Sequence, residues 1–137
     1  MSTYTDYHKL IEAARQASSG SYSPYSRFRV GAALACSDGS IFSGVNIENR
    51  SFGLTICAER AAVFAAVSAG RRDFEAIAVY SPDAAYPIPP CGACRQVLSE
   101  FASADFTVVM ACEERWVAHG INELLPFDSL HELRDGD

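Results

Sequence analysis

Positive charge is scarce in this sequence. There are 11 Lys and Arg residues against 17 Asp and Glu, which gives a formal net charge of −6. The basic residues are scattered, and only Arg71 and Arg72 are adjacent. A protein that binds a phosphate backbone usually presents a basic stripe. We therefore expect no nucleic-acid partner.

Long apolar runs and a leader pattern are also missing. The apolar runs stop well short of the roughly 18 to 20 residues that a membrane helix needs, and residues 1–6 lack the basic and apolar regions of a signal peptide. No internal repeat, low-complexity tract or linker interrupts the 137 residues. We expect a cytoplasmic protein without membrane attachment, folded as one domain over residues 1–137.

The apolar pattern predicts an α/β fold. Asp38-Gly39 is a hairpin signal between two strands, and the later alternation of strands and helices favours parallel pairing. We expect a three-layer αβα sandwich in which a mixed five-stranded sheet carries helices on both faces. The predicted elements are helix 6–18, strands 28–36 and 41–45, helix 57–68, strand 76–81, helix 91–101, strand 106–111, a short strand 116–118 and a short helix 121–125.

The five cysteines are an odd number, which argues against a disulfide framework. Cys57, Cys91 and Cys94 lie at the starts of two predicted helices, where free N–H groups and the positive helix end favour thiolates. Cys91 and Cys94 are three residues apart and share one face of a helical turn, so both sulfurs can reach one zinc ion. Cys57 could supply a third ligand, leaving the fourth position for water, as in catalytic zinc sites.

Glu59 follows Cys57 by two residues. At a helix start its carboxylate could face a water molecule at the metal, accept a proton from it and pass the proton to a leaving amine. Two other interpretations of the cysteines stay open, a redox pair and a structural zinc site. The structural site would need a fourth ligand from Cys36, Cys112, His8, His119 or His131.

These residues closely resemble the homotetrameric cytidine deaminases, in their three-cysteine branch. The deaminase signature is H-x-E followed by P-C-x-x-C, and this chain has Cys57-Ala58-Glu59 and Pro90-Cys91-Gly92-Ala93-Cys94. The resemblance covers almost the whole chain. Its further segments are YSPYS at 22–26, FRVGAAL at 28–34, NIEN at 46–49, RQVL at 95–98 and ELLP at 123–126.

The resemblance implies the fold of these enzymes and hydrolytic deamination of cytidine and deoxycytidine. It implies one zinc ion per chain on the three cysteines, with Glu59 as the proton shuttle, and a homotetramer whose sites lie near subunit interfaces. Asn46 and Glu48 would bind the ribose 3′-hydroxyl. Phe28 would pack against the nucleoside, and Ala58 would also contact it.

Arg60 has an electrostatic reason to lie beside the zinc site. Three thiolates and Zn²⁺ sum to a net charge of −1, which weakens the metal as a Lewis acid. A guanidinium hydrogen-bonded to the sulfurs would withdraw some of that charge, and the resemblance assigns this role to the arginine after the glutamate. The alternative is a solvated arginine on the helix surface.

Three rival functions follow from the same residues: a deaminase of another aminopyrimidine such as blasticidin S, a nucleic-acid-editing deaminase, and a non-catalytic zinc-stabilised binding module. The Asn46 and Glu48 pair argues against the first, and the acidic balance argues against the second. Arg50 and Phe52 depart from the alanine and tyrosine of many family members. Arg50 could reach the 5′ end of the nucleoside or form an interface ion pair, and we favour the ion pair.

Overall fold

A five-stranded sheet forms the centre of the protein, and the computed structural model describes residues 6–128 of the chain. The strands lie in the order β2-β1-β3-β4-β5. β1 pairs antiparallel with both β2 and β3, β3 pairs parallel with β4, and β4 pairs antiparallel with β5. The strands are β1 (Gly31–Cys36), β2 (Ile41–Val45), β3 (Phe74–Tyr80), β4 (Ala102–Ala111) and β5 (Trp116–Gly120).

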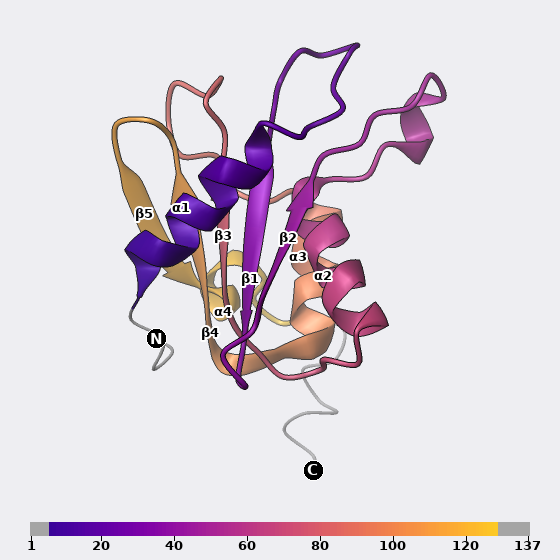
Figure 1. Cartoon of the computed structure of the whole chain (residues 1–137). Coiled ribbons are helices and arrows are strands. Elements are labelled where there is room, and N and C mark those ends of the chain that lie inside the picture. The colour runs from indigo at the N-terminus through magenta and orange to yellow at the C-terminus, as the bar shows by residue number, and fades with distance from the viewer. Residues whose placement is uncertain (1–5, 129–137) are drawn as a thin grey trace.

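Helices cover both faces of this sheet, which confirms the expected three-layer sandwich (Figure 1). On one face Leu10 and Ala14 of α1 are fully buried against small side chains of β1 and β3. On the other face Ala62 and Leu98 belong to a core cluster that also holds Ile121. The helices are α1 (Tyr7–Ser18), η1 (Phe52–Leu54), α2 (Ala58–Ser68), α3 (Gly92–Phe101) and α4 (Ile121–Leu124).

Two strand boundaries differ from the prediction. β1 begins at Gly31 rather than at residue 28, because side chains make most of the hydrogen bonds to the backbone of residues 28–30, with a single backbone bond from the Asn46 N–H to the Val30 carbonyl. β4 begins at Ala102 rather than at residue 106. In its first part, residues Ser103 to Asp105 are exposed, so the apolar pattern gave no signal there.

No helix within residues 6–128 is long and apolar enough to cross a membrane.

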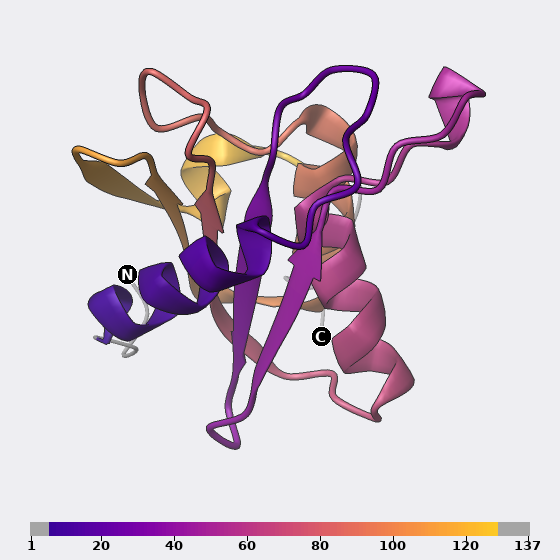
Figure 2. The same ribbon diagram turned by 45° about the horizontal axis from the view of Figure 1, so that its top comes forward.

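Several loops leave the sheet at one common edge, the one formed by the ends of the strands. Gly31, which begins β1, pairs with Val45 at the end of β2 and with Tyr80 at the end of β3. The segments before β1 and after β2 and β3 therefore meet at this edge, at the top of Figure 1, where α2 and α3 also begin. In Figure 2 the segment 46–56 extends away from the body of the protein, with η1 at its tip.

Candidate active site

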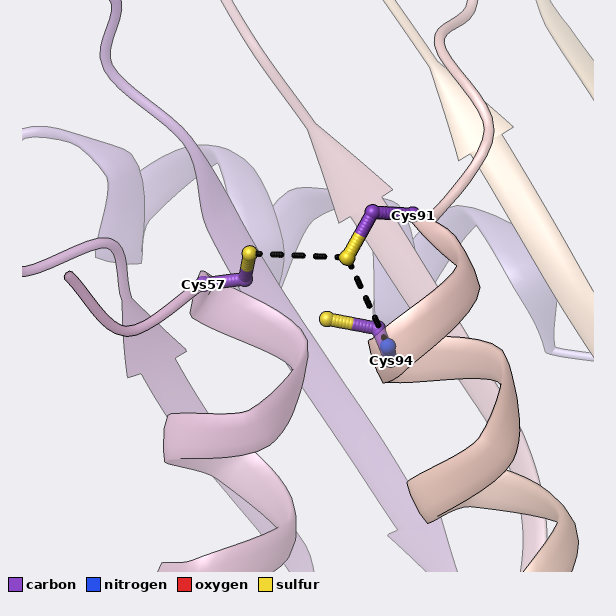
Figure 3. Close-up of side chains that lie close together, drawn as sticks. All are labelled: Cys57, Cys91 and Cys94. Carbon is purple, nitrogen blue, oxygen red and sulfur yellow. Dashed lines mark hydrogen bonds between the residues drawn. The ribbon is translucent and has the colours of Figure 1, made fainter. Parts of the chain in front are cut away.

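Three cysteines converge where α2 and α3 begin, at the edge where the loops meet. Cys57 is the N-cap of α2 and Cys91 is the N-cap of α3, while Cys94 lies in the first turn of α3. The sulfur of Cys91 accepts the backbone N–H of Cys94 at 3.4 Å, which satisfies one of the free donors at the helix start. The three side chains point toward one another from the two helices (Figure 3).

The sulfur separations fit a single zinc ion. All three Sγ atoms lie within 4.8 Å of one another, and Cys57 Sγ is 3.8 Å from Cys91 Sγ. Tetrahedral coordination with Zn–S bonds of about 2.3 Å separates neighbouring sulfurs by about 3.8 Å. Within residues 6–128, this metal-ligand group contains three residues and no fourth. The donor set therefore matches a zinc site with one open position.

The other ligand candidates lie elsewhere. Cys36 pairs with Phe74 at the opposite end of the sheet, and the Cys112 thiol hydrogen-bonds the Arg115 carbonyl at 3.7 Å. The ring of His119 contacts Glu123 at 3.2 Å. His8 is on α1, where its ring meets Trp116 edge-on, and His131 lies outside the described residues.

Arg60 provides positive charge beside the sulfurs. Its Nη2 donates to Cys57 Sγ at 3.3 Å. Hydrogen bonds with Cys94, Arg60 and Cys91, the largest of them with Cys94, outweigh the opposing effect of burial and lower the pKa of Cys57 to about 5. The pKa of the Arg60 guanidinium rises, chiefly through its bond to Cys57. Its Nε is buried and has no hydrogen-bond partner within the described part of the chain.

Glu59 is buried next to the cysteine cluster. Only 5% of the residue is exposed, and this burial raises the pKa of its carboxyl group to about 7. Ala58 before it is fully buried and begins α2. The carboxyl group lies in the first turn of α2, two residues after Cys57, and interacts electrostatically with Cys57 and Cys94.

Asn46 is bound to the segment that contains Phe28. Its Nδ2 donates to the Phe28 carbonyl at 2.8 Å, and its Oδ1 accepts the Val30 N–H at 3.0 Å. The Ser21 hydroxyl donates to the same oxygen. The residue is 9% exposed. With two bonds at the oxygen and one at the nitrogen, the second N–H of the amide has no hydrogen-bond partner among residues 6–128.

Glu48 also has local partners. One carboxylate oxygen accepts the backbone N–H groups of Tyr25 and Ser26 at 3.0 and 3.1 Å, and the other accepts the Ser26 hydroxyl. These bonds lower the pKa of Glu48, with the Ser26 hydroxyl as the largest cause. Glu48, Tyr25 and Ser26 line an open hollow of about 430 Å³ together with Phe52 and Thr55.

Sequence reasoning missed two residues of this network. Ser21 and Ser26 connect the predicted nucleoside-binding residues to the backbone around them, and the Ser26 hydroxyl also accepts the Phe28 N–H at 3.0 Å. Single serines carry no pattern that reveals such partners. Ser26 ends the YSPYS segment, which gave only a resemblance, and Ser21 lies just before that segment.

Comparisons with known proteins agree with this geometry. Residues 4–111 match the family model of the cytidine and deoxycytidylate deaminase zinc-binding region. A cytidine deaminase of Halalkalibacterium halodurans is 53% identical over 122 residues, which covers 88% of this chain and 92% of that protein. A blasticidin-S deaminase of Bacillus cereus is 34% identical over 125 residues, covering 86% of this chain and 88% of that protein.

A solved structure has the same fold. The crystal structure of a cytidine deaminase from Burkholderia pseudomallei superimposes with a TM-score of 0.86 at 46% identity. The superposition covers 90% of this chain and 99% of that one. The likeness therefore extends over most of the chain.

Proposed function

The chain belongs to the cytidine and deoxycytidylate deaminase family, and from that premise we infer that it is a zinc-dependent cytidine deaminase. The reaction takes cytidine or deoxycytidine and water to uridine or deoxyuridine and ammonia. The convergence of Cys57, Cys91 and Cys94 beside the buried Glu59 is the observation that carries this inference. A redox pair would need two cysteines and would leave the third, and Glu59, without a role.

Cys57, Cys91 and Cys94 would hold one zinc ion. When bound, this ion acts as a Lewis acid and activates a water molecule for attack on C4 of the pyrimidine ring. Arg60 takes charge from the thiolates through its hydrogen bond to Cys57. Without this bond the three thiolates would leave the site with excess negative charge.

Glu59 moves the protons of the reaction. Its carboxylate accepts one proton from the attacking water and delivers it to N3 of the ring, then accepts the remaining proton of the new C4 hydroxyl and delivers it to the leaving amine, so that ammonia departs as the C4 carbonyl forms. Its burial keeps bulk water away from the carboxyl group. A single positioned group can serve both transfers, because delivery of the first proton returns it to the carboxylate that accepts the second.

Phe28, Asn46, Glu48 and Ala58 orient the nucleoside. The remaining N–H of Asn46 donates to a ribose hydroxyl, and the carboxylate of Glu48 accepts from one. Phe28 is half-buried, so part of its ring is available to pack against the nucleoside. Ala58, at the first position of α2, contacts the base beside the cysteines.

We propose a homotetramer with sites near its interfaces. The segments 22–25 and 47–54 expose five large apolar side chains to solvent in a single chain, and an assembly would cover them. Four copies of the 14.8 kDa chain would have a mass of about 59 kDa in light scattering. The exposed residues are Tyr22, Tyr25, Ile47, Phe52 and Leu54.

Free nucleosides are the proposed substrates, and nucleotides are poor ones. Arg50 is exposed on the segment that carries Phe52, and we assign it to an ion pair across an interface. Arg50→Ala should then lower turnover of cytidine and 5′-deoxycytidine equally. A loss confined to cytidine would place Arg50 at the 5′-hydroxyl, and efficient parent turnover of cytidine monophosphate would overturn the choice of substrate.

The cellular setting follows from the same chemistry. Metal-binding thiolates suit the reducing cytoplasm, where the reaction would serve pyrimidine salvage.

We propose that residues 1–137 form one domain and that neither nucleic acid nor a membrane takes part in the reaction.

The test is an assay of the purified parent with cytidine, deoxycytidine and blasticidin S, followed by ultraviolet absorbance and ammonia release. The proposal expects one ammonia per nucleoside consumed and a clear preference for the nucleosides. Preference for blasticidin S would favour the function of the more distant relative. Zinc without any deamination would favour a binding module.

A further inference from the structure

Side chains provide most of the hydrogen bonds that hold the backbone of residues 28–30, and the Asn46 backbone N–H adds one bond to the Val30 carbonyl at 3.3 Å. The Phe28 N–H donates to Ser26 Oγ at 3.0 Å, and Asn46 binds the Phe28 carbonyl and the Val30 N–H. The Arg29 N–H donates to Asp83 Oδ2 at 2.8 Å. The backbone around Phe28 is therefore bound by the side chains of Ser26, Asn46 and Asp83, and Asp83 is the one that lies farthest away in the sequence.

Asp83 holds Arg29 through three hydrogen bonds. Besides the backbone N–H, Arg29 Nε donates to Oδ2 at 3.0 Å and Nη2 donates to Oδ1 at 2.8 Å. This two-point contact between guanidinium and carboxylate fixes orientation as well as distance. The bonds from Arg29 lower the pKa of Asp83 to about 2, so the carboxylate is charged throughout the neutral range.

Asp83 also lies in the segment that leads to the zinc ligands. Its N–H donates to Ser81 Oγ at 3.2 Å, directly after β3, and the irregular segment 82–90 then runs to Cys91. The far end of that segment is held separately, because Arg95 Nε donates to the Pro90 carbonyl at 2.8 Å. One contact thus joins the start of this segment to the residue that follows Phe28.

We propose that Asp83, through Arg29, is a positioning residue that sets Phe28 relative to the segment carrying Cys91 and so fixes where the nucleoside lies. This inference rests on the proposed function. It deepens that function by adding Asp83, which lies 54 positions after Arg29 and belongs neither to the quoted motif segments nor to the metal site.

The effect should appear in nucleoside binding more than in stability. The side chains of Arg29 and Asp83 are 50% and 26% exposed, and ion pairs at such exposure contribute little to folding. Positioning is different, because a displacement of about 1 Å can cost up to about 100-fold in rate. Asn46 and Ser26 still hold Phe28 when Asp83 is lost, so we expect a smaller effect, on the order of 10-fold.

The chain supplies a matched control pair. Arg71 Nε donates to Asp38 Oδ2 at 2.9 Å, with side-chain exposures of 41% and 51%. Asp38 is in the turn between β1 and β2, at the end of the sheet away from the cysteines (Figure 1). Asp38 also accepts the Ser40 N–H and hydroxyl, as Asp83 accepts the Arg29 N–H. Asp38→Ala therefore removes an arginine–aspartate contact and local turn bonds without touching the nucleoside site.

The experiment compares the parent, Asp83→Ala, Arg29→Ala, the double variant and Asp38→Ala. For each, the KM and kcat for cytidine, the dissociation constant of uridine by calorimetry, the zinc content and the Tm are measured. We expect Asp83→Ala to raise the KM and the uridine dissociation constant about 10-fold, with kcat within about threefold of the parent. Zinc content and Tm should match those of Asp38→Ala.

The variants should also follow a set order in how strongly they weaken nucleoside binding. Arg29→Ala keeps the backbone bond to Asp83 and should weaken binding less than Asp83→Ala does. The double variant should equal Asp83→Ala, because no partner remains for the arginine to lose. Asp83→Glu, which restores a charged acceptor, should recover part of the loss.

Several results would overturn the positioning role. One is a KM and a uridine dissociation constant for Asp83→Ala within twofold of those of Asp38→Ala, in an active parent. Another is a rise in KM accompanied by loss of zinc or by a larger fall in Tm, which would indicate a merely structural contact. A parent that neither deaminates cytidine nor binds uridine would overturn the proposed function itself, and this inference with it.

Discussion

Gly44 is the position where one added carbon should disturb the zinc site from a distance. Gly44 lies in β2 and faces α2. A Cβ there would be 2.4 Å from the Ala62 nitrogen and 2.5 Å from the Ala58 carbonyl oxygen. Both are backbone atoms of a helix, so no side-chain rotation can relieve the clash. Gly44→Ala must push α2 away from the sheet.

The required shift can be read from the distances. Ordinary contact begins near 3.4 Å, so the helix has to retreat by about 1 Å from the position that gives 2.4 Å. Overpacking of a core typically costs 1–3 kcal/mol, and a backbone clash should lie at the upper end of that range. For a chain of this size, about 3 kcal/mol corresponds to a fall in Tm of roughly 10 °C.

The same shift should reach the metal. Cys57 is the N-cap of α2, so a retreat of the helix moves its sulfur away from Cys91 and Cys94. Thermal unfolding, zinc content and cytidine turnover of Gly44→Ala should be measured beside Gly20→Ala. At Gly20 a Cβ meets its nearest atom at 3.4 Å, an ordinary contact.

We expect Gly44→Ala to lose both stability and zinc, while Gly20→Ala stays near the parent. A Gly44→Ala protein with a Tm within about 2 °C of the parent and full zinc content would refute this reasoning. It would mean that β2 and α2 separate at little cost and that their close approach does not set the position of Cys57.

Three further predictions concern single side chains. Glu59→Gln should keep the fold and the zinc but lose at least about 100-fold in kcat, since a positioned proton shuttle contributes about 10² to 10⁴; retention of more than a tenth of the activity would exclude this role. Arg60→Ala should fold and lose about 10- to 100-fold in zinc affinity or turnover, and an unchanged rate and affinity would return Arg60 to a solvated helix residue. The Asp83 carboxyl should titrate near pH 2 by NMR and at a higher pH in Arg29→Ala. Because the folded pKa lies below the ordinary value of 3.8, its contribution to stability is present above that value and is lost as the pH falls toward 2; an ordinary midpoint in the parent would contradict the Arg29 contact.

The parts of the fold that the sequence predicted well are those with local signals. Asp38-Gly39 predicted the hairpin between β1 and β2, and each cysteine segment predicted the start of a helix to within one residue. These features depend on residues that are neighbours in the chain. The register of hydrogen bonds that joins β1 to both β2 and β3 has no such signal and came only with the structure.

The boundary at residue 28 shows why other parts could not be predicted. Phe28 to Val30 is apolar enough to extend the strand, yet its backbone bonds go to Ser26, Asn46 and Asp83. Asp83 follows Arg29 by 54 residues and belongs to no motif. Sequence patterns report periodicity and spacing, whereas this contact depends on how two loops meet at the edge of the sheet.

X-ray absorption at the zinc edge of the purified protein tests the central claim most directly. A site built from Cys57, Cys91 and Cys94 with one open position predicts one zinc per chain, bound by three sulfurs at about 2.3 Å and one nitrogen or oxygen near 2.0–2.2 Å. Addition of a tight-binding pyrimidine analogue should change the light-atom shell and leave the three sulfurs in place. A shell of four sulfurs, or protein purified without chelators that contains no zinc, would contradict the account.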